Sequence, residues 1–195
     1  MASIGAGGVI YLTPLVFNKI GFSAASIATG TACAALIGTC ARFLSGKIID
    51  EGKGYVTPIR LAAITAILSD LVLFQANIFP AFIVGQILLG IAAGLYWPAV
   101  EVAIPESCEK YNPQEAFALA RTADAIGVAL GALTGSFLAW QGKINFIYIL
   151  DLFTMLILLY LFSNKKDYKK KINKDNNLST NQINRVGKLN TNNLV

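Results

Sequence analysis

The sequence predicts an all-α integral membrane protein with six transmembrane helices and a polar C-terminal tail. Hydrophobic residues make up 55% of the 195 residues, whereas charged residues make up only 14%. The mean hydropathy is +0.58, and most of the lysines follow residue 163. A soluble domain of this length needs more charge to cover its surface. We therefore expect a membrane-embedded bundle over residues 1–163 and a disordered tail over 164–195, which is too polar to repay the entropy of folding.

Six apolar stretches are long enough to cross the hydrocarbon core of a bilayer, which takes about 20 residues of helix. They are residues 3–19, 24–46, 59–77, 80–103, 117–140 and 145–163. The first stretch lacks a preceding basic segment, so we interpret it as a span and not as a signal peptide. Ser23, which follows Phe22, is predicted to cap the second helix at its N-terminus.

The basic residues of the loops predict the orientation of the bundle. Lys47, Lys53, Arg60, Lys110 and the tail lysines share one side, against Lys19 and Lys143 on the other. Loops rich in lysine and arginine stay in the cytoplasm, so we expect both termini there. The tail lysines either contact anionic lipid or act as a plain stop-transfer flank.

Cysteine and histidine usage argues against metal binding and most enzyme chemistry. Cys33, Cys40 and Cys108 form no CxxC pair, and we interpret them as small buried hydrophobic residues. The sequence has no histidine, which removes the commonest metal ligand and the usual neutral-pH general base. We expect no cofactor and no enzymatic activity.

Two short segments of the chain resemble each other. GAGGVIYLTP over residues 5–14 and GIAAGLYWP over residues 90–98 both place small residues before a tyrosine and a proline shortly after it. They lie on the first and fourth predicted helices. Because three helices is an odd number, the second unit would be upside down relative to the first, as in the 3+3 inverted repeats of transporters.

The segment GKIIDEGKG over residues 46–54 joins the second and third predicted spans. Gly46 and Asp50 are four residues apart and share one helical face. The glycine leaves room for another helix, and the carboxylate is available to a cation or a helix N-terminus.

This segment resembles the loop signature of the major facilitator superfamily, which runs glycine, three residues, aspartate, arginine, one residue, glycine and then basic residues. Gly46 and Asp50 match the signature, whereas Glu51 replaces the arginine and Lys53 replaces the second glycine. In that family the segment meets the other half of the transporter and helps to close the cytoplasmic side. The resemblance therefore implies a gating role for Gly46, Asp50 and Lys53.

Other helices support the resemblance. GQILLGIAAGLYWPA over residues 85–99 resembles the family's fourth helix, with Gln86 where an arginine often stands. Gly127, Gly131 and Gly135 resemble the glycine stripe of the efflux branch, although that branch's proline is missing. We interpret the stripe first as a helix-packing device.

The resemblance covers residues 1–163 and implies the N-terminal six-helix half of a facilitator in the plasma or inner membrane. We expect either the product of a truncated or split gene or a half that must find a partner. It implies secondary active, proton-coupled efflux of small amphipathic molecules, by rocking against a second six-helix half or in a homodimer. Membrane lipid is the other expected partner, and nucleic acid is not. The alternative is a non-transporting relic or scaffold of the same fold.

Three charged residues lie near the loop between the fourth and fifth spans. Arg121 and Asp124 are three residues apart on one face, and Glu101 lies near the end of the fourth span, so the three are expected to share a network. Such a network either holds the two helices together or acts as a gate or proton-coupling device.

Asp70 lies near the middle of the third span, where an isolated carboxylate costs about 2.5–3.5 kcal/mol. It must be protonated, paired or facing water, and Asp151 in the sixth span raises the same question. Because the third and sixth helices of the resembled family lie outside its cavity, the main interpretation is a carboxyl group hydrogen-bonded within the bundle. A coupling role is the alternative.

Substrate contacts are expected on the first and fourth helices. The candidates are Tyr11, Thr13, Asn18, Gln86, Tyr96 and Trp97. Pro98 removes the backbone hydrogen bond to the carbonyl of Gly94, so it is expected to kink or loosen the helix beside Tyr96 and Trp97. Aromatic residues beside a kink either line a cavity for amphipathic ligands or form an interfacial belt.

Overall fold

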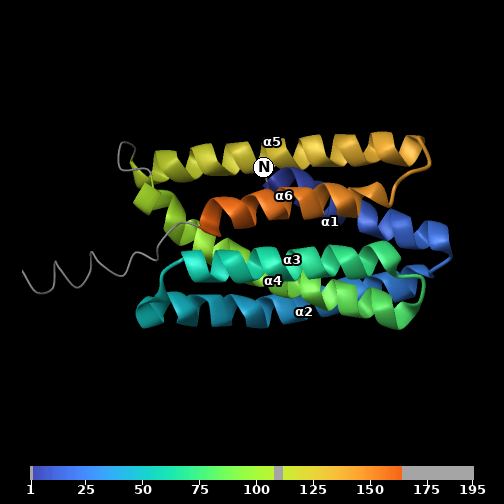
Figure 1. Ribbon diagram of the computed structural model, residues 1–195, viewed down its shortest axis with the longest axis horizontal. Coiled ribbons are helices and arrows are strands. Elements are labelled where there is room, and N and C mark those ends of the chain that lie inside the picture. Colours follow the sequence, from blue (N-terminus) through green and yellow to red (C-terminus); the bar gives the residue numbers. More distant parts are fainter. Residues whose placement is uncertain (1, 108–111, 164–195) are drawn as a thin grey trace, which may run out of the picture.

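The computed structural model describes residues 2–107 and 112–163, and within them the chain folds into six α-helices and one π-helical turn. The elements are α1 Ala2–Ile20, α2 Ala24–Ile48, the turn η1 Ile49–Lys53, α3 Val56–Gln75, α4 Phe79–Ser107, α5 Pro113–Trp140 and α6 Phe146–Ser163. The helices lie side by side along the long axis of the bundle (Figure 1). The expected spans agree with these helices to within a few residues.

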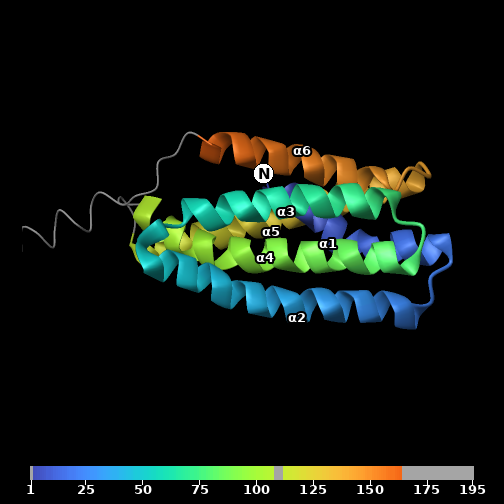
Figure 2. The same cartoon turned by 60° about the horizontal axis from the view of Figure 1, so that its bottom comes forward.

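The helices pack in a simple series, in which α2 contacts α4, α4 contacts α3, α3 contacts α6, α6 contacts α1 and α1 contacts α5. The two ends of the series, α2 and α5, therefore lie on opposite sides of the bundle (Figures 1 and 2). If α1 is exchanged with α4, α2 with α5 and α3 with α6, the same set of helix contacts results. The two three-helix units thus pack in equivalent ways.

Glycine lets the outer helices approach their neighbours closely. A Cβ atom on Gly38 of α2 would lie 2.9 Å from the carbonyl oxygen of Gly90 in α4, and one on Gly7 of α1 would lie 2.6 Å from that of Val128 in α5. Backbones come this close only where side chains are missing. The expected stripe Gly127, Gly131 and Gly135 is buried, and Cβ atoms there would lie close to Ser3, Ile4 and Leu12 of α1.

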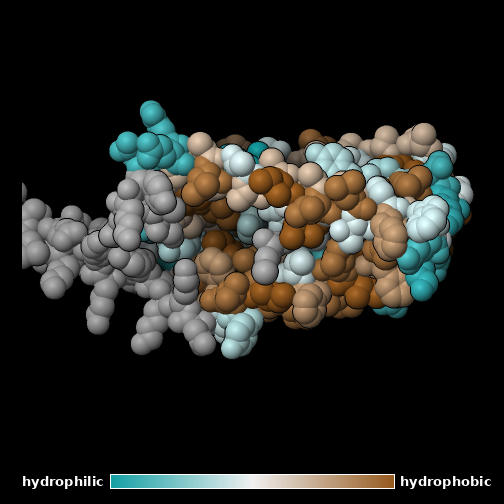
Figure 3. Space-filling model, turned by 90° about the horizontal axis from the view of Figure 1, so that it is seen from above, coloured by the Kyte–Doolittle hydropathy of each residue, from teal (hydrophilic) through white to brown (hydrophobic). Residues whose placement is uncertain are grey.

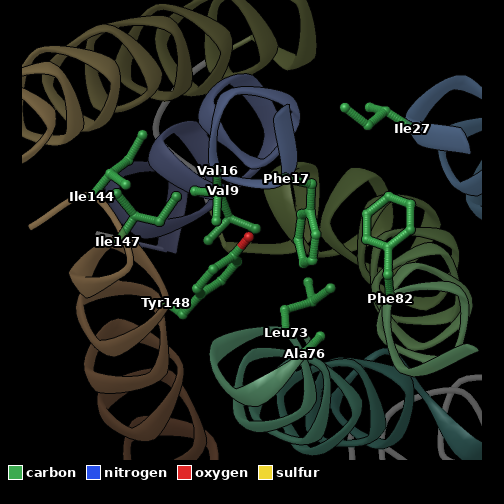
Figure 4. Packing of buried hydrophobic residues seen from close by; sticks show 10 residues of the cluster. All are labelled: Val9, Val16, Phe17, Ile27, Leu73, Ala76, Phe82, Ile144, Ile147 and Tyr148. Carbon is green, nitrogen blue, oxygen red and sulfur yellow. The ribbon is translucent and has the colours of Figure 1, made fainter. Parts of the chain in front are cut away.

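An aromatic cluster closes the end of the bundle where α1 meets α2 and α3 meets α4. The rings of Phe17 and Phe82 lie 4.3 Å apart between their centroids, and Phe22 meets Phe82 edge-on at 5.7 Å. Figure 4 shows Phe17, Phe82 and Leu73 converging from three helices. The expected cap is also present, because the hydroxyl of Ser23 accepts a hydrogen bond from the backbone N–H of Ser26 at 3.1 Å.

The outer surface suits a bilayer. In the view of Figure 3, hydrophobic residues cover the middle of the bundle and hydrophilic residues gather toward its ends. Among the described residues, the five helices α2 to α6 are long and apolar enough to cross a membrane. The first expected span, residues 3–19, forms the helix α1 but is not one of these five. Its glycines and its terminal Asn18 and Lys19 lower its mean hydropathy.

Two expectations need correction. The segment 46–54 is not a loop throughout, because the helical backbone of α2 continues into η1 as far as Glu51. The chain then turns at Gly52 and Gly54, whose φ angles are 76° and 70°. The cysteines are not all buried, since Cys40 is exposed and Cys33 is half-buried on α2. Cys108, Lys110 and the tail 164–195 lie outside the described residues.

Candidate functional site

A cleft of about 360 Å³ opens between α1, α2 and α4. Its walls are mostly small or apolar residues, contributed by Ile10 and Pro14 of α1, Ala34 and Gly38 of α2 and Phe82 of α4. Its polar side chains are those of Thr13, Thr31, Thr39, Arg42 and Gln86. A mainly apolar wall with a few polar groups is typical of sites for small molecules.

The six expected substrate-contact residues divide into three groups. Thr13 and Gln86 line this cleft, and Tyr96 and Trp97 line two other cavities farther along α4. Tyr11 and Asn18 are exposed and do not line the cleft. The hydroxyl of Thr13 also accepts a 3.1 Å hydrogen bond from the hydroxyl of Tyr148 in α6. It is therefore already hydrogen-bonded within the protein.

Arg42 is a cleft residue that the sequence analysis missed. It lies on the exposed face of α2 and lines both the cleft and a second depression nearer the end of the helix. No hydrogen bond or ion pair joins Arg42 to another described residue. The position of Arg42 inside the apolar span 24–46 could have predicted this, because an arginine inside such a span usually faces water or a partner.

The signature residues Gly46 and Asp50 do share one face. They line a shallow depression of about 690 Å³ at the end of α2, together with Arg42 and Lys47. A Cβ atom on Gly46 would meet nothing within 4 Å, and Asp50 is exposed. Lys53 instead forms a 2.9 Å ion pair with Glu51 of its own turn, and an exposed pair of this kind contributes little stability.

A polar cluster joins the ends of α4 and α5. Arg121 donates a 2.8 Å hydrogen bond to Glu101, and its guanidinium lies 4.7 Å from the ring centre of Trp97. Asp124 is not part of this ion pair, since it accepts a 2.6 Å hydrogen bond from the hydroxyl of Ser3 in α1. The expected network is therefore two adjacent pairs along one cavity of about 150 Å³.

An inner cavity of about 110 Å³ lies deeper among α1, α3, α4, α5 and α6. It shares Ser3, Tyr96, Trp97 and Asp124 with the cavity of about 150 Å³ beside Arg121, which we call the outer cavity, and Asp151 of α6 also lines it. The two cavities thus extend from the exposed Arg121 to a buried carboxyl group.

Asp70 and Asp151 are the two most deeply buried acidic groups described, each 1% exposed. Asp151 accepts a 3.2 Å hydrogen bond from the hydroxyl of Thr154. Neither carboxyl oxygen of Asp70 has a hydrogen-bond partner among the described residues. The expectation of a hydrogen-bonded carboxyl group is therefore correct for Asp151 and wrong for Asp70, which also lies apart from the Glu101–Arg121 pair.

These features define a multi-pass helical membrane protein whose polar groups gather along cavities between its helices. The sequence matches the family model of the Major Facilitator Superfamily over residues 1–186, and the chain belongs to this family. It is thus a transporter of the facilitator type. None of the curated proteins matches the chain.

Proposed function

We propose that the chain is the six-helix unit of a secondary active transporter that exports small amphipathic molecules in exchange for protons. The cleft between α1, α2 and α4 carries the proposal. Its volume of about 360 Å³ and mostly apolar lining suit a small molecule with a large apolar part. Gln86 is only 4% exposed and offers both a donor and acceptors to a polar group of the substrate.

The charge in the cleft favours neutral or anionic amphipathic molecules. Arg42 is the one charged side chain among the described residues that line it. An arginine beside an apolar wall attracts a carboxylate or sulfonate and repels an amine. The substrate class we propose is therefore amphipathic molecules without a net positive charge.

A second six-helix unit, supplied by the same or another chain, would complete the transporter. Two observations support this step: the open space beside Gly46 and the exposed carboxylate of Asp50, which lines the same depression. The equivalent packing of α1–α3 and α4–α6 supports an inverted repeat, the architecture in which one bundle rocks against another around a central site. We place both termini in the cytoplasm, in accord with the loop charges.

The Glu101–Arg121 pair is suited to a gate. Its side chains are about half exposed, at 49% and 52%, so the pair can break without burying a charge. Trp97 stacks under the guanidinium and lines both the inner and the outer cavity. Separation of α4 and α5 at this end would therefore open both cavities together.

The experiment is dye transport in proteoliposomes that contain the chain with a second six-helix unit of the same family. Fluorescein, an anionic dye, and rhodamine 6G, a cationic dye, are followed with and without a pH gradient. We expect gradient-dependent movement of fluorescein, and Gln86→Leu should slow it about tenfold, the equivalent of one lost hydrogen bond of about 1.4 kcal/mol.

Gln114→Leu is the matched control, because Gln114 is exposed at the start of α5 and should leave transport unchanged. Faster transport of rhodamine 6G would overturn the charge preference. If neither dye moves although the protein is folded and inserted, the alternative of a non-transporting scaffold is favoured.

A further inference from the structure

We propose that Asp70 and Asp151 form one proton-binding site, buried between α3 and α6 and connected through the inner cavity to the surface at Arg121. The inference rests on the proposed function in naming this proton as the coupling ion. The presence of the site is tested separately from transport.

The register of α3 against α6 places the two carboxyl groups at the same level. The helices run in opposite directions (Figure 1). Ala66, one turn before Asp70, belongs to the same buried cluster as Met155, one turn after Asp151. On the other side, Leu73 and Tyr148 belong to a second buried cluster (Figure 4).

The ends of the two helices confirm this register. The guanidinium of Arg60, near the start of α3, donates hydrogen bonds of 2.7–2.9 Å to the carbonyl oxygens of Phe162 and Ser163 at the end of α6. Contacts on both sides of the aspartates thus place them at the same level.

Among residues 2–107 and 112–163, no cation is available at this level to neutralise two carboxylates. Arg60 is bound at the end of the helices, and Lys19 is exposed in the last turn of α1. Residues 79–100 of α4 include no charged residue. Three other titratable groups lie nearby: Tyr148 of α6, whose hydroxyl donates to Thr13, and Tyr96 and Asp124, which line the inner cavity with Asp151. None of them is a cation.

Two buried carboxylates without a cation would repel one another in a medium of low dielectric constant. One bound proton removes this repulsion, because it converts one group to a carboxylic acid that can donate to the other. Both oxygens of Asp70 lack a donor among the described residues, so they are free to accept that hydrogen bond. The site is thus built to hold a proton.

The inner cavity gives the proton a route. Asp151 lies in its wall, and Asp124 and Tyr96 lie in the part that it shares with the outer cavity. Gly5 of α1 makes room for Asp151, because a Cβ atom there would collide with its carboxyl oxygen and lie 2.6 Å from its Cα. In the binding step a hydronium ion from the cavity gives its proton to a carboxylate oxygen and leaves water. Release is the reverse step.

The first test is infrared spectroscopy of the full chain in lipid, which detects the C=O stretch of protonated carboxyl groups. At neutral pH the wild type should show this band, and the double variant Asp70→Asn and Asp151→Asn should lose most of it. Asp50→Asn is the control and should leave the band unchanged, since Asp50 is exposed. An equal band in the double variant would overturn the site.

The second test needs no substitution, so it holds even where the double variant does not fold. Dicyclohexylcarbodiimide modifies protonated carboxyl groups in apolar surroundings, and mass spectrometry locates the modified residues. We expect labelling at Asp70 or Asp151 that falls severalfold as the pH rises. Labelling that falls with added NaCl but not with KCl would identify a sodium site and overturn the proposal.

The outcomes for the proton site and for transport are distinguishable. A protonated pair in a protein that moves no dye would contradict the proposed function alone. Proton-coupled dye transport without a band and without labelling at either aspartate would contradict the proton site alone.

Discussion

Arg121 of α5 and Glu101 of α4 are joined by a 2.8 Å hydrogen-bonded ion pair at the same end of the bundle. The two helices pack little against one another elsewhere, because α4 contacts α2 and α3 while α5 contacts α1. Trp97 adds a cation–π contact at 4.7 Å. A few polar and aromatic groups therefore connect α4 to α5, two helices of the same three-helix unit.

A double-mutant cycle tests this connection. Arg121→Ala should lower the thermal stability of the protein in lipid nanodiscs, because it leaves Glu101 without its partner. Glu101→Gln in the same chain should recover part of the loss. Since both side chains are about half exposed, we expect a coupling free energy of about 0.2–1 kcal/mol.

Thr122→Ala is the control for this cycle, because the exposed hydroxyl of Thr122 bonds only within its own helix, to the carbonyl of Ala118. Strictly additive losses for Arg121→Ala and Glu101→Gln would mean that the pair does not form in the membrane.

The presence of the six helices could be predicted from the sequence, because a long apolar segment in a bilayer must satisfy its backbone hydrogen bonds internally and an α-helix does so. The cap at Ser23 also followed, since it depends on local chemistry. The end of α2 did not. Helical backbone continues past Ile48 through Asp50 and Glu51 and breaks at Gly52, whose φ is 76°, and charge content alone did not reveal this.

The candidate site was predictable in part. The pairing of Arg121 with Glu101 followed from their positions near one loop, whereas the bond between Asp124 and Ser3 required knowing that α1 packs against α5. In the same way, Asp70 was recognised as costly from its depth in its span. Its placement beside Asp151 depends on the register of two helices far apart in sequence, which no local pattern contains.

Alanine substitutions at Gly38 and Gly46, both on α2, should have different effects on the stability of the protein. Gly38→Ala should destabilise the protein by about 1–3 kcal/mol, because the added Cβ would lie 2.9 Å from the carbonyl oxygen of Gly90 and the two backbones must move apart. Gly46→Ala adds the same methyl group where nothing lies within 4 Å. It should be neutral or stabilise the helix by up to about 1 kcal/mol.

Thermal unfolding of the two single variants in the same lipid measures this difference. Equal melting temperatures for Gly38→Ala and Gly46→Ala would show that α2 and α4 do not approach as closely as described.

The proposed orientation predicts where reporter fusions are active. A reporter that works only in the cytoplasm should be active when fused after Lys53 and inactive when fused after Asn77 or Lys143. The reason is that positively charged loops are retained on the cytoplasmic side. Activity at Asn77 would contradict the topology, and a reporter that works only outside the cytoplasm should give the complementary pattern.

The depression around Gly46 and Asp50 predicts an effect that appears only when a second six-helix unit is present. Asp50→Asn should change little in the chain alone, because Asp50 is exposed and forms no hydrogen bond or ion pair with another described residue. With a matching second unit, the same substitution should weaken association by about 1.5–3 kcal/mol, the contribution of one charge-assisted hydrogen bond.

Gly46→Leu should weaken the same association by filling the space that a neighbouring helix would occupy. Glu51→Gln is the matched control, since Glu51 lies one residue away but is paired with Lys53. The measurement is pull-down of the two units from the same membranes, together with dye transport by the reconstituted pair. If Asp50→Asn and Gly46→Leu bind and transport as well as Glu51→Gln does, the end of α2 is a solvated turn and the second unit docks elsewhere.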